Sequence, residues 1–177
     1  QGERFLEWLE RLKRERAWTA ARAALRRSLA FDPGAYPPAM PYVEPFVKEE
    51  GWKREAYYLV AALYALKDGN HQEGRTLARA LREKAQHSGS VERRFLALLD
   101  ADRDQIAFRL RQAVGLVDGE LDFAQLLDDL LRWFDPERKV QIRWAKEFYG
   151  EEAKREETAS ESGTTKQDGA EAMEVEA

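Results

Sequence analysis

Apolar residues recur along this chain at intervals of three and four positions, the spacing that places them on one face of an α-helix. The clearest case is the series Val140, Trp144 and Phe148. Leu and Ala together number 46, whereas Val, Ile and Thr together number 15, and this balance favours helix over sheet. The pattern predicts an all-α fold, a bundle of about eight to nine helices. The predicted helices span residues 3–16, 18–30, 41–48, 52–67, 71–86, 91–100, 103–117, 122–134 and 136–149.

Polar residues and glycines mark the expected ends of these helices. Three candidate caps stand three residues before a Glu or Gln, which is the spacing of a capping box: Asn70, Asp102 and Asp122. Asp135 and Pro136 suit the start of the last helix, since Asp is a good cap and Pro fits the first helical position. Gly69, Gly119 and Gly150 are expected to end helices.

Two segments divide the chain by composition. Three of its six prolines lie within residues 33–38, which predicts an ordered connector or a hinge. Residues 1–150 are expected to form an all-helical domain, which this connector could split into an N-terminal helical lobe and a C-terminal helical bundle. Residues 151–177 contain almost no large apolar side chain and carry a net charge of −6. Such a segment cannot bury enough apolar surface to compensate for the conformational entropy that it would lose on folding, so a disordered acidic tail is predicted.

This tail accounts for the negative net charge of the chain, which is −4 overall but +2 for residues 1–150. Arg outnumbers Lys by 20 to 9, and the planar guanidinium group suits bidentate contacts with phosphate or carboxylate. The cations recur in rows at helical spacing, as a phosphate backbone would require; solvated faces or ion-pair networks would explain the rows equally well. The rows are Arg22, Arg26 and Arg27; Arg75, Arg79 and Arg82; Arg93 and Arg94; Arg109 and Arg111; and Lys139, Arg143 and Lys146.

The sequence lacks the constellations that most enzymes need. It has no cysteine, which excludes disulfides and thiolate chemistry, and it contains no phosphate-binding glycine loop or nucleophile motif. His71 and His87 have no acid at metal-ligand spacing. Asp100, Asp102 and Asp104 suggest a divergent metal-dependent nuclease, but a helix end, a cap and a first helical turn explain them better. We therefore expect neither an enzyme nor a metal or cofactor.

The longest apolar run covers residues 57–66 and is too short to cross a bilayer. The first predicted helix is charged throughout, so it does not look like a signal peptide. Together with the lack of cysteine, these features predict a soluble cytoplasmic protein that does not bind membranes.

Several short segments, in collinear order between Phe5 and Tyr149, are similar to those of one family. They are Phe5-x-x-Trp8-Leu9, Ala23-Ala24-Leu25-Arg26-Arg27, Trp52 ahead of Leu59-Val60-Ala61-Ala62-Leu63, Arg94-Phe95-x-x-Leu98-Leu99, Leu110-Arg111-x-x-Val114-x-Leu116, Asp129-Leu130-x-x-Trp133 and Trp144-Ala145-x-x-Phe148-Tyr149. In these segments the chain resembles the CasB family, the small subunit of the type I-E CRISPR surveillance complex Cascade. The acidic tail lies outside the resemblance.

The resemblance implies an all-helical, non-catalytic subunit, present as a pair, that contacts the backbone and large subunits of Cascade. It also implies sequence-independent contacts with the hybrid of CRISPR RNA and target DNA and with the displaced DNA strand, which would stabilise the R-loop in antiviral defence. The candidate phosphate contacts are, by motif, Arg26, Arg27, Arg94 and Arg111 and, by row spacing, Arg22, Arg93 and Arg143. The alternative is a helical adaptor whose arginines pair with acidic protein partners rather than with nucleic acid.

Overall fold

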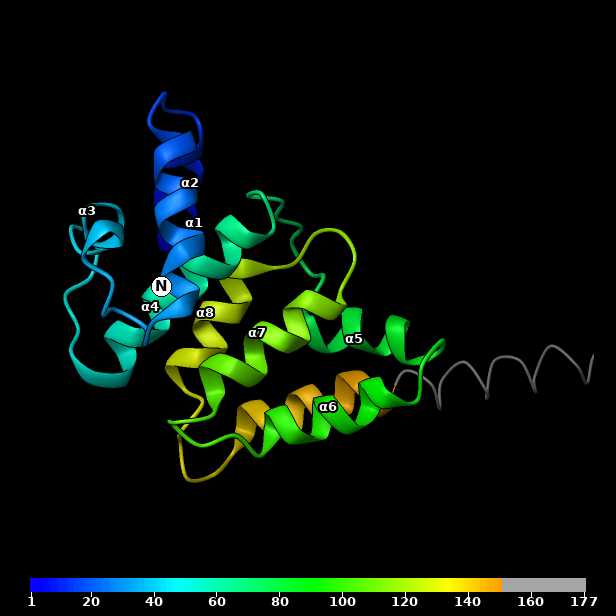
Figure 1. The fold of residues 1–177 in the computed structure, drawn as a ribbon. Coiled ribbons are helices and arrows are strands. Elements are labelled where there is room, and N and C mark those ends of the chain that lie inside the picture. The colour runs from blue at the N-terminus through cyan, green and yellow to red at the C-terminus, as the bar shows by residue number, and fades with distance from the viewer. Residues whose placement is uncertain (151–177) are drawn as a thin grey trace, which may run out of the picture.

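The computed structural model describes residues 1–150, which are helical over most of their length and contain no strand (Figure 1). The α-helices are α1 (Gly2–Lys13), α2 (Trp18–Arg27), α3 (Met40–Val43), α4 (Gly51–Leu66), α5 (Leu77–Ala85), α6 (Ser90–Leu99), α7 (Ile106–Leu116) and α8 (Phe123–Leu131). Two 3-10 helices, η1 (Ser28–Ala30) and η2 (Pro37–Ala39), lie between α2 and α3. A further helix covers residues 139–150. The all-α class predicted from the spacing of apolar residues is confirmed; the predicted tail lies outside the described residues.

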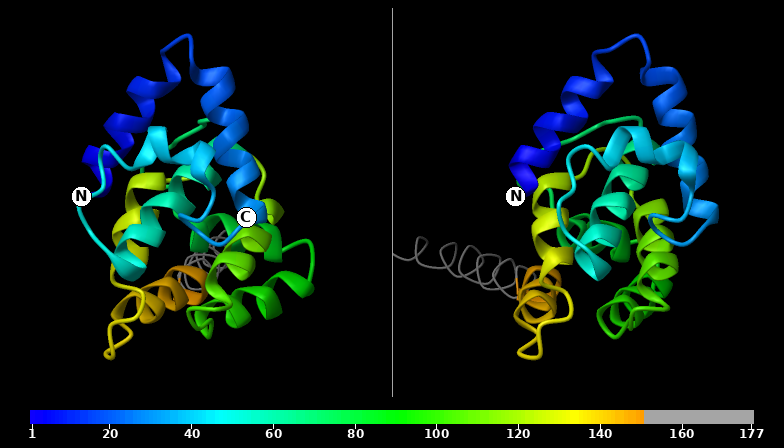
Figure 2. Two further views of the ribbon diagram at one scale, coloured as in Figure 1. Left: turned by 60° about the vertical axis from the view of Figure 1, so that its left-hand side comes forward. Right: turned by 90° about the vertical axis from the view of Figure 1, so that its left-hand side faces the viewer.

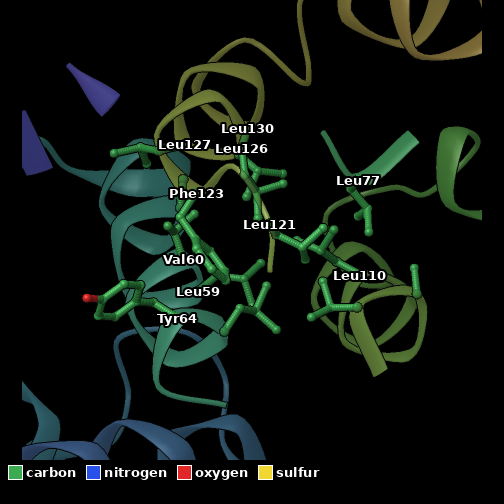
Figure 3. Close-up of a cluster of buried hydrophobic side chains, with 14 of the residues drawn as sticks. Leu59, Val60, Tyr64, Leu77, Leu110, Leu121, Phe123, Leu126, Leu127 and Leu130 are labelled. Atoms are coloured by element: carbon green, nitrogen blue, oxygen red, sulfur yellow. The ribbon is translucent and has the colours of Figure 1, made fainter. Parts of the chain in front are cut away.

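Helix α4 forms the centre of the molecule because it is apolar on every side. Each residue from Ala56 to Ala65 is buried, and the helix packs against both α2 and α8. Its Tyr64 meets Phe123 of α8 edge to face, with ring centroids 5.4 Å apart (Figure 3). The longest apolar run of the sequence is therefore a core helix. No helix within residues 1–150 is long and apolar enough to cross a membrane.

One hydrophobic cluster joins both ends of the described chain. It contains Phe5 of α1 as well as Trp144 and Phe148 of the helix over residues 139–150. Phe148 stacks on Phe95 of α6 with ring centroids 4.3 Å apart, and Trp144 meets Trp133 edge to face at 5.0 Å. The burial predicted from the apolar series in the last helix is confirmed.

Asp122 is confirmed as a helix cap, and Asp102 forms the predicted capping box on the turn that precedes α7. Asp122 Oδ1 accepts a hydrogen bond of 2.9 Å from Gln125 N at the start of α8. Asp102 Oδ1 accepts one of 3.0 Å from Gln105 N, and Gln105 Oε1 accepts one of 3.4 Å from Asp102 N, which is the reciprocal arrangement of a capping box. Gly69 ends α4 with φ +70°, a left-handed conformation that glycine adopts without strain.

The third predicted cap, Asn70, is wrong, and so is the start of the helix predicted after it. Residues 70–76 instead run beside the segment that precedes α8, where Gln72 N donates to Leu121 O at 3.0 Å. Helix α5 begins after this segment, and its cap is Thr76. Local spacing could not reveal the pairing, because the two segments are far apart in the sequence.

Several other helices also differ from their predicted extent by about one turn, and two of these differences have a clear local cause. The third predicted helix is a single turn, α3, because Pro45 has no N–H to continue the helical hydrogen bonds. The last helix starts after a turn over residues 135–138 rather than at Pro136. In this turn Arg138 N donates to Asp135 O at 3.0 Å and Arg138 has φ +54°. Asp135 therefore closes a turn instead of capping the helix.

Candidate nucleic-acid interface

Helix α7 lies between the end of α2 and α6 (Figure 2). One of its arginines contacts η1, which follows α2, and another contacts α6. Arg111 Nη1 donates to Leu29 O of η1 at 3.3 Å, and Arg109 Nη1 donates to Ala97 O of α6 at 2.5 Å. Both acceptors are uncharged carbonyl oxygens. These bonds therefore orient the guanidinium groups without neutralising them.

The last turn of α2 carries two further arginines, Arg26 and Arg27, immediately before η1. Both side chains are exposed, and their guanidinium groups have no ion pair or hydrogen bond with residues 1–150. Cations are favoured at this end of a helix, where the unpaired carbonyl groups carry partial negative charge. Because Arg111 contacts η1, three of the predicted arginines lie around the junction of α2, η1 and α7.

Helix α6 adds Arg93 and Arg94, which are exposed and have no ionic partner within the described part of the chain. The adjacent acid, Glu92, is engaged elsewhere, because its Oε1 accepts a hydrogen bond of 2.8 Å from Tyr149 Oη. Burial and the Glu92 carboxylate raise the pKa of Tyr149 to about 12, so the hydroxyl remains a donor.

These side chains occupy three adjacent elements, which follow one another along one edge of the molecule in the right-hand view of Figure 2. We call them the arginine face: Arg26, Arg27, Arg93, Arg94 and Arg111. The sequence predicted all of them as candidates. The structure adds that none of them is paired with a carboxylate of residues 1–150.

Arg143, another predicted candidate, has internal partners instead. It forms an ion pair with Asp129 of α8, whose side chain is only 3% exposed. Asp129 also accepts hydrogen bonds of 2.7 Å from Trp144 Nε1 and 2.9 Å from Gln125 Nε2. Arg143 therefore neutralises a buried carboxylate and holds the helix over residues 139–150 against α8. The cationic stripe predicted for this helix is interrupted at its central member, so Arg143 is not part of the arginine face.

The remaining predicted rows are also broken by acids from other elements. Arg22 forms an ion pair with Asp68, which follows α4. The prediction of one exposed row on the fifth helix is wrong, because Arg75 precedes α5 and pairs with Glu83 at 3.2 Å. Arg82 is only 6% exposed. Spacing along one helix gave no indication of these tertiary contacts.

Candidate metal ligands do not converge within residues 1–150. No group of three or more His, Cys, Asp or Glu side chains in that range could hold a metal ion. His71 Nδ1 accepts a hydrogen bond of 3.1 Å from Phe123 N, and Asp102 caps the turn before α7. Both side chains thus have structural partners.

Sequence reasoning missed a cavity beside Arg111. It has a volume of about 240 Å³ and lies between η1, the loop that follows it and α7. Two of its lining residues, Phe31 and Phe108, are 45% and 65% exposed. The sequence does contain a signal for it, since Phe108 falls outside the apolar stripe that Ile106 and Leu110 begin on the same helix.

The fold and this surface define an all-α protein built around an apolar central helix, with an exposed cationic face across α2, α7 and α6. A family model described as CRISPR-associated protein Cse2 matches residues 21–149, and the chain belongs to this family. A CRISPR-associated protein Cse2 from Thermus thermophilus is 74% identical over 163 residues, which cover 90% of this chain and 96% of that protein. The family resemblance inferred from the collinear segments is confirmed.

Solved structures agree with this assignment. A crystal structure of a Cse2-family CRISPR-associated protein from Thermus thermophilus is 76% identical, with a TM-score of 0.81, and covers 84% of this chain and 97% of its own. A chain from a CRISPR RNA-guided surveillance complex is 24% identical, with a TM-score of 0.71, and covers 92% of this chain and 96% of its own. At that identity the likeness shows the fold alone.

Proposed function

We propose that this protein is the non-catalytic small subunit of a CRISPR RNA-guided surveillance complex. In this role it binds nucleic acid independently of sequence and stabilises the guide–target hybrid and the displaced DNA strand of the R-loop. Family membership and the fold shared with a chain of such a complex support the assignment to the complex. The observation that carries the nucleic-acid part is the arginine face, whose exposed cations have no carboxylate partner within residues 1–150.

The chemistry of the arginine face suits this role. Contacts from arginine to phosphate position a strand without reading its bases. R-loop formation exchanges one duplex for another of similar stability, so a few additional backbone contacts can shift the balance. A weak, sequence-independent interaction is therefore sufficient, and the subunit needs no reactive group of its own.

The proposal includes protein contacts with the backbone and large subunits and with a second copy of this chain. Leu96 of α6 and Ile142 of the helix over residues 139–150 are 47% and 51% exposed. The two helices pack together through Phe95 and Phe148. Large apolar side chains exposed on neighbouring helices are typical of protein interfaces. The same apolar surface would also serve the second candidate function, a helical adaptor whose arginines pair with acidic partners.

The test compares two double charge reversals that change the net charge equally. Arg26→Glu with Arg27→Glu alters the arginine face, whereas Arg4→Glu with Arg11→Glu alters exposed arginines of α1 that have no ionic partner within residues 1–150. Affinity for a single-stranded DNA of about 20 nucleotides is measured by fluorescence anisotropy between about 50 and 200 mM salt. Each phosphate contact with a single strand contributes about 0.7 to the slope of log affinity against log salt. We therefore expect the α2 variant to lose about 1.4 of the slope and the α1 variant to change little.

Three outcomes would count against the proposal. Equal losses in the two variants would mean that binding follows net charge and not the arginine face. A wild-type affinity that does not change with salt would refute electrostatic binding altogether. If the α2 reversals leave DNA binding intact but abolish assembly with the other subunits, the adaptor function is favoured.

A further inference from the structure

The cavity beside Arg111 combines a buried apolar wall with exposed aromatic rings. Leu59 and Ala62 of α4, each 2% exposed, form its inner wall, and the exposed rings of Phe31 and Phe108 form its outer wall. Apolar side chains that are exposed singly are common on protein surfaces, but their grouping at a concave site is typical of a binding site. Their position at one cavity suggests that they meet the same partner.

One of the two rings is held in place before any ligand binds. Phe31 stacks on Tyr36 with ring centroids 4.7 Å apart and an interplanar angle of 13°. On α7, Phe108 stands three positions before Arg111, so the ring and the guanidinium group share a side of the helix. Aromatic surfaces with few rotatable bonds bind a planar ring at a low cost in conformational entropy.

Charged groups around the cavity are arranged in two sets. Arg111 lines it, and Arg26 and Arg27 directly precede η1, which forms one of its sides. Asp32 and Asp104 also line it. Carboxylates repel phosphate, but they accept hydrogen bonds from the amino groups of nucleobases. The cations therefore suit a sugar–phosphate backbone, and the two carboxylates, both on exposed residues, suit the amino group of a base.

We propose that this cavity receives one unpaired base of a bound single strand, which stacks on Phe108 while the adjoining phosphates meet the arginines of α2 and α7. The volume of about 240 Å³ is below the range of about 300–1,000 Å³ that is typical of small-molecule sites, so it suits a base rather than a whole nucleotide. The inference rests on the proposed function, because the strand must first lie along the arginine face. Cytosine, which has an amino group to donate to Asp32 or Asp104, binds better than thymine.

The test uses the full chain and three single strands of equal length: oligo-dC, oligo-dT and a strand of abasic sites. Phe108→Ala is compared with Phe134→Ala, which removes a phenylalanine ring that is 38% exposed and lies outside the cavity. Because stacking of one base on an aromatic side chain contributes about tenfold or more to affinity, Phe108→Ala lowers the affinity for oligo-dC by about that factor. It leaves the abasic-strand affinity and the salt slope unchanged, and Phe134→Ala leaves all three quantities unchanged.

The possible failures of the two proposals differ. If the wild type binds the abasic strand with the expected salt slope but Phe108→Ala has no effect on oligo-dC, the cavity proposal is overturned and the proposed function stands. A Phe108→Ala variant that weakens the base-bearing and abasic strands equally also overturns it. Loss of subunit assembly with unchanged DNA binding would assign the cavity to a protein side chain. If the wild type binds no strand in a salt-dependent way, the proposed function itself fails.

Discussion

Removal of the Arg143 side chain should destabilise the protein, because it leaves the Asp129 carboxylate in the core without its cation. Truncating one member of a buried ion pair costs about 3–5 kcal/mol. Here the exposed fractions are unequal, 3% for the Asp129 side chain and 42% for that of Arg143, so solvent screens part of the interaction. Trp144 Nε1 and Gln125 Nε2 continue to donate to the carboxylate in the variant. We therefore expect Arg143→Ala to lower the free energy of unfolding by about 2 kcal/mol.

Thermal unfolding followed by circular dichroism measures this loss. For a chain of this length a change of about 2 kcal/mol corresponds to a fall in Tm of about 4–8 °C. Lys139→Ala is the matched control, because it removes an ion pair with Glu137 in which both side chains are mostly exposed, 82% and 70%. The control should stay within about 0.5 kcal/mol of the wild type.

A loss for Arg143→Ala as small as that of the control would refute the reasoning, since Asp129 would then not depend on its cation. Below its melting temperature the variant should bind single-stranded DNA as the wild type does. The combination of Arg26→Glu with Arg27→Glu should show the opposite behaviour, with unchanged stability and reduced affinity. Measured together, the two variants separate arginines that stabilise the fold from arginines that bind a ligand.

Three further changes test local features. Gly69→Ala should lower the free energy of unfolding, measured in urea, by about 1–2 kcal/mol. The reason is that φ is +70° and the added Cβ would lie 2.8 Å from Lys13 Cδ. An unchanged unfolding midpoint would show that the turn relaxes. Asp122→Ala should lower the free energy of unfolding by about 1–2 kcal/mol, because Asp122 caps α8. It should also speed amide hydrogen exchange at Gly74, whose N–H donates to Asp122 at 2.8 Å. Unchanged exchange at Gly74 would contradict this. The Arg54 guanidinium beside Glu44, together with a hydrogen bond from Tyr58, holds the pKa of that carboxyl below its ordinary value. Its stabilisation is present above the pKa of the unfolded chain and is lost as pH falls through the lowered folded pKa, so unfolding midpoints of Glu44→Gln should depend less on pH in the acid range than those of the wild type.

The fold class and most of the helices could be predicted because helical spacing is a local property of the sequence. The apolar run in α4 and the cap at Asp122 required no knowledge of tertiary contacts. The late start of α5 could not be predicted in the same way, since Gln72 is held by Leu121, which is far away in the sequence. The single turn of α3 had a local signal in Pro45, but the apolar residues around it favoured a longer helix.

Only part of the candidate site could be predicted from the sequence, because the rest depends on tertiary contacts. Arg22 and Arg26 share one helix and stand four residues apart, so their spacing makes them equivalent. In the folded chain Arg22 forms an ion pair with Asp68, which follows α4, whereas Arg26 forms none with the acids of residues 1–150. Sequence spacing locates cations on a helix, and only the tertiary structure shows which of them a carboxylate already neutralises.

This distinction explains how a chain with a net charge of −4 could bind a polyanion. At physiological ionic strength the Debye length is about 8 Å, so a phosphate group responds mainly to the charges within that distance. Arg111 is held by the carbonyl oxygen of Leu29 and not by a carboxylate, so it keeps its full charge at a fixed position beside Arg26 and Arg27. If this local effect governs binding, deleting residues 151–177, which changes the net charge by six units, should alter DNA affinity at about 150 mM salt less than reversing Arg26 and Arg27 does. A larger effect of the deletion would show that total charge, and not the arrangement of unpaired arginines, controls the interaction.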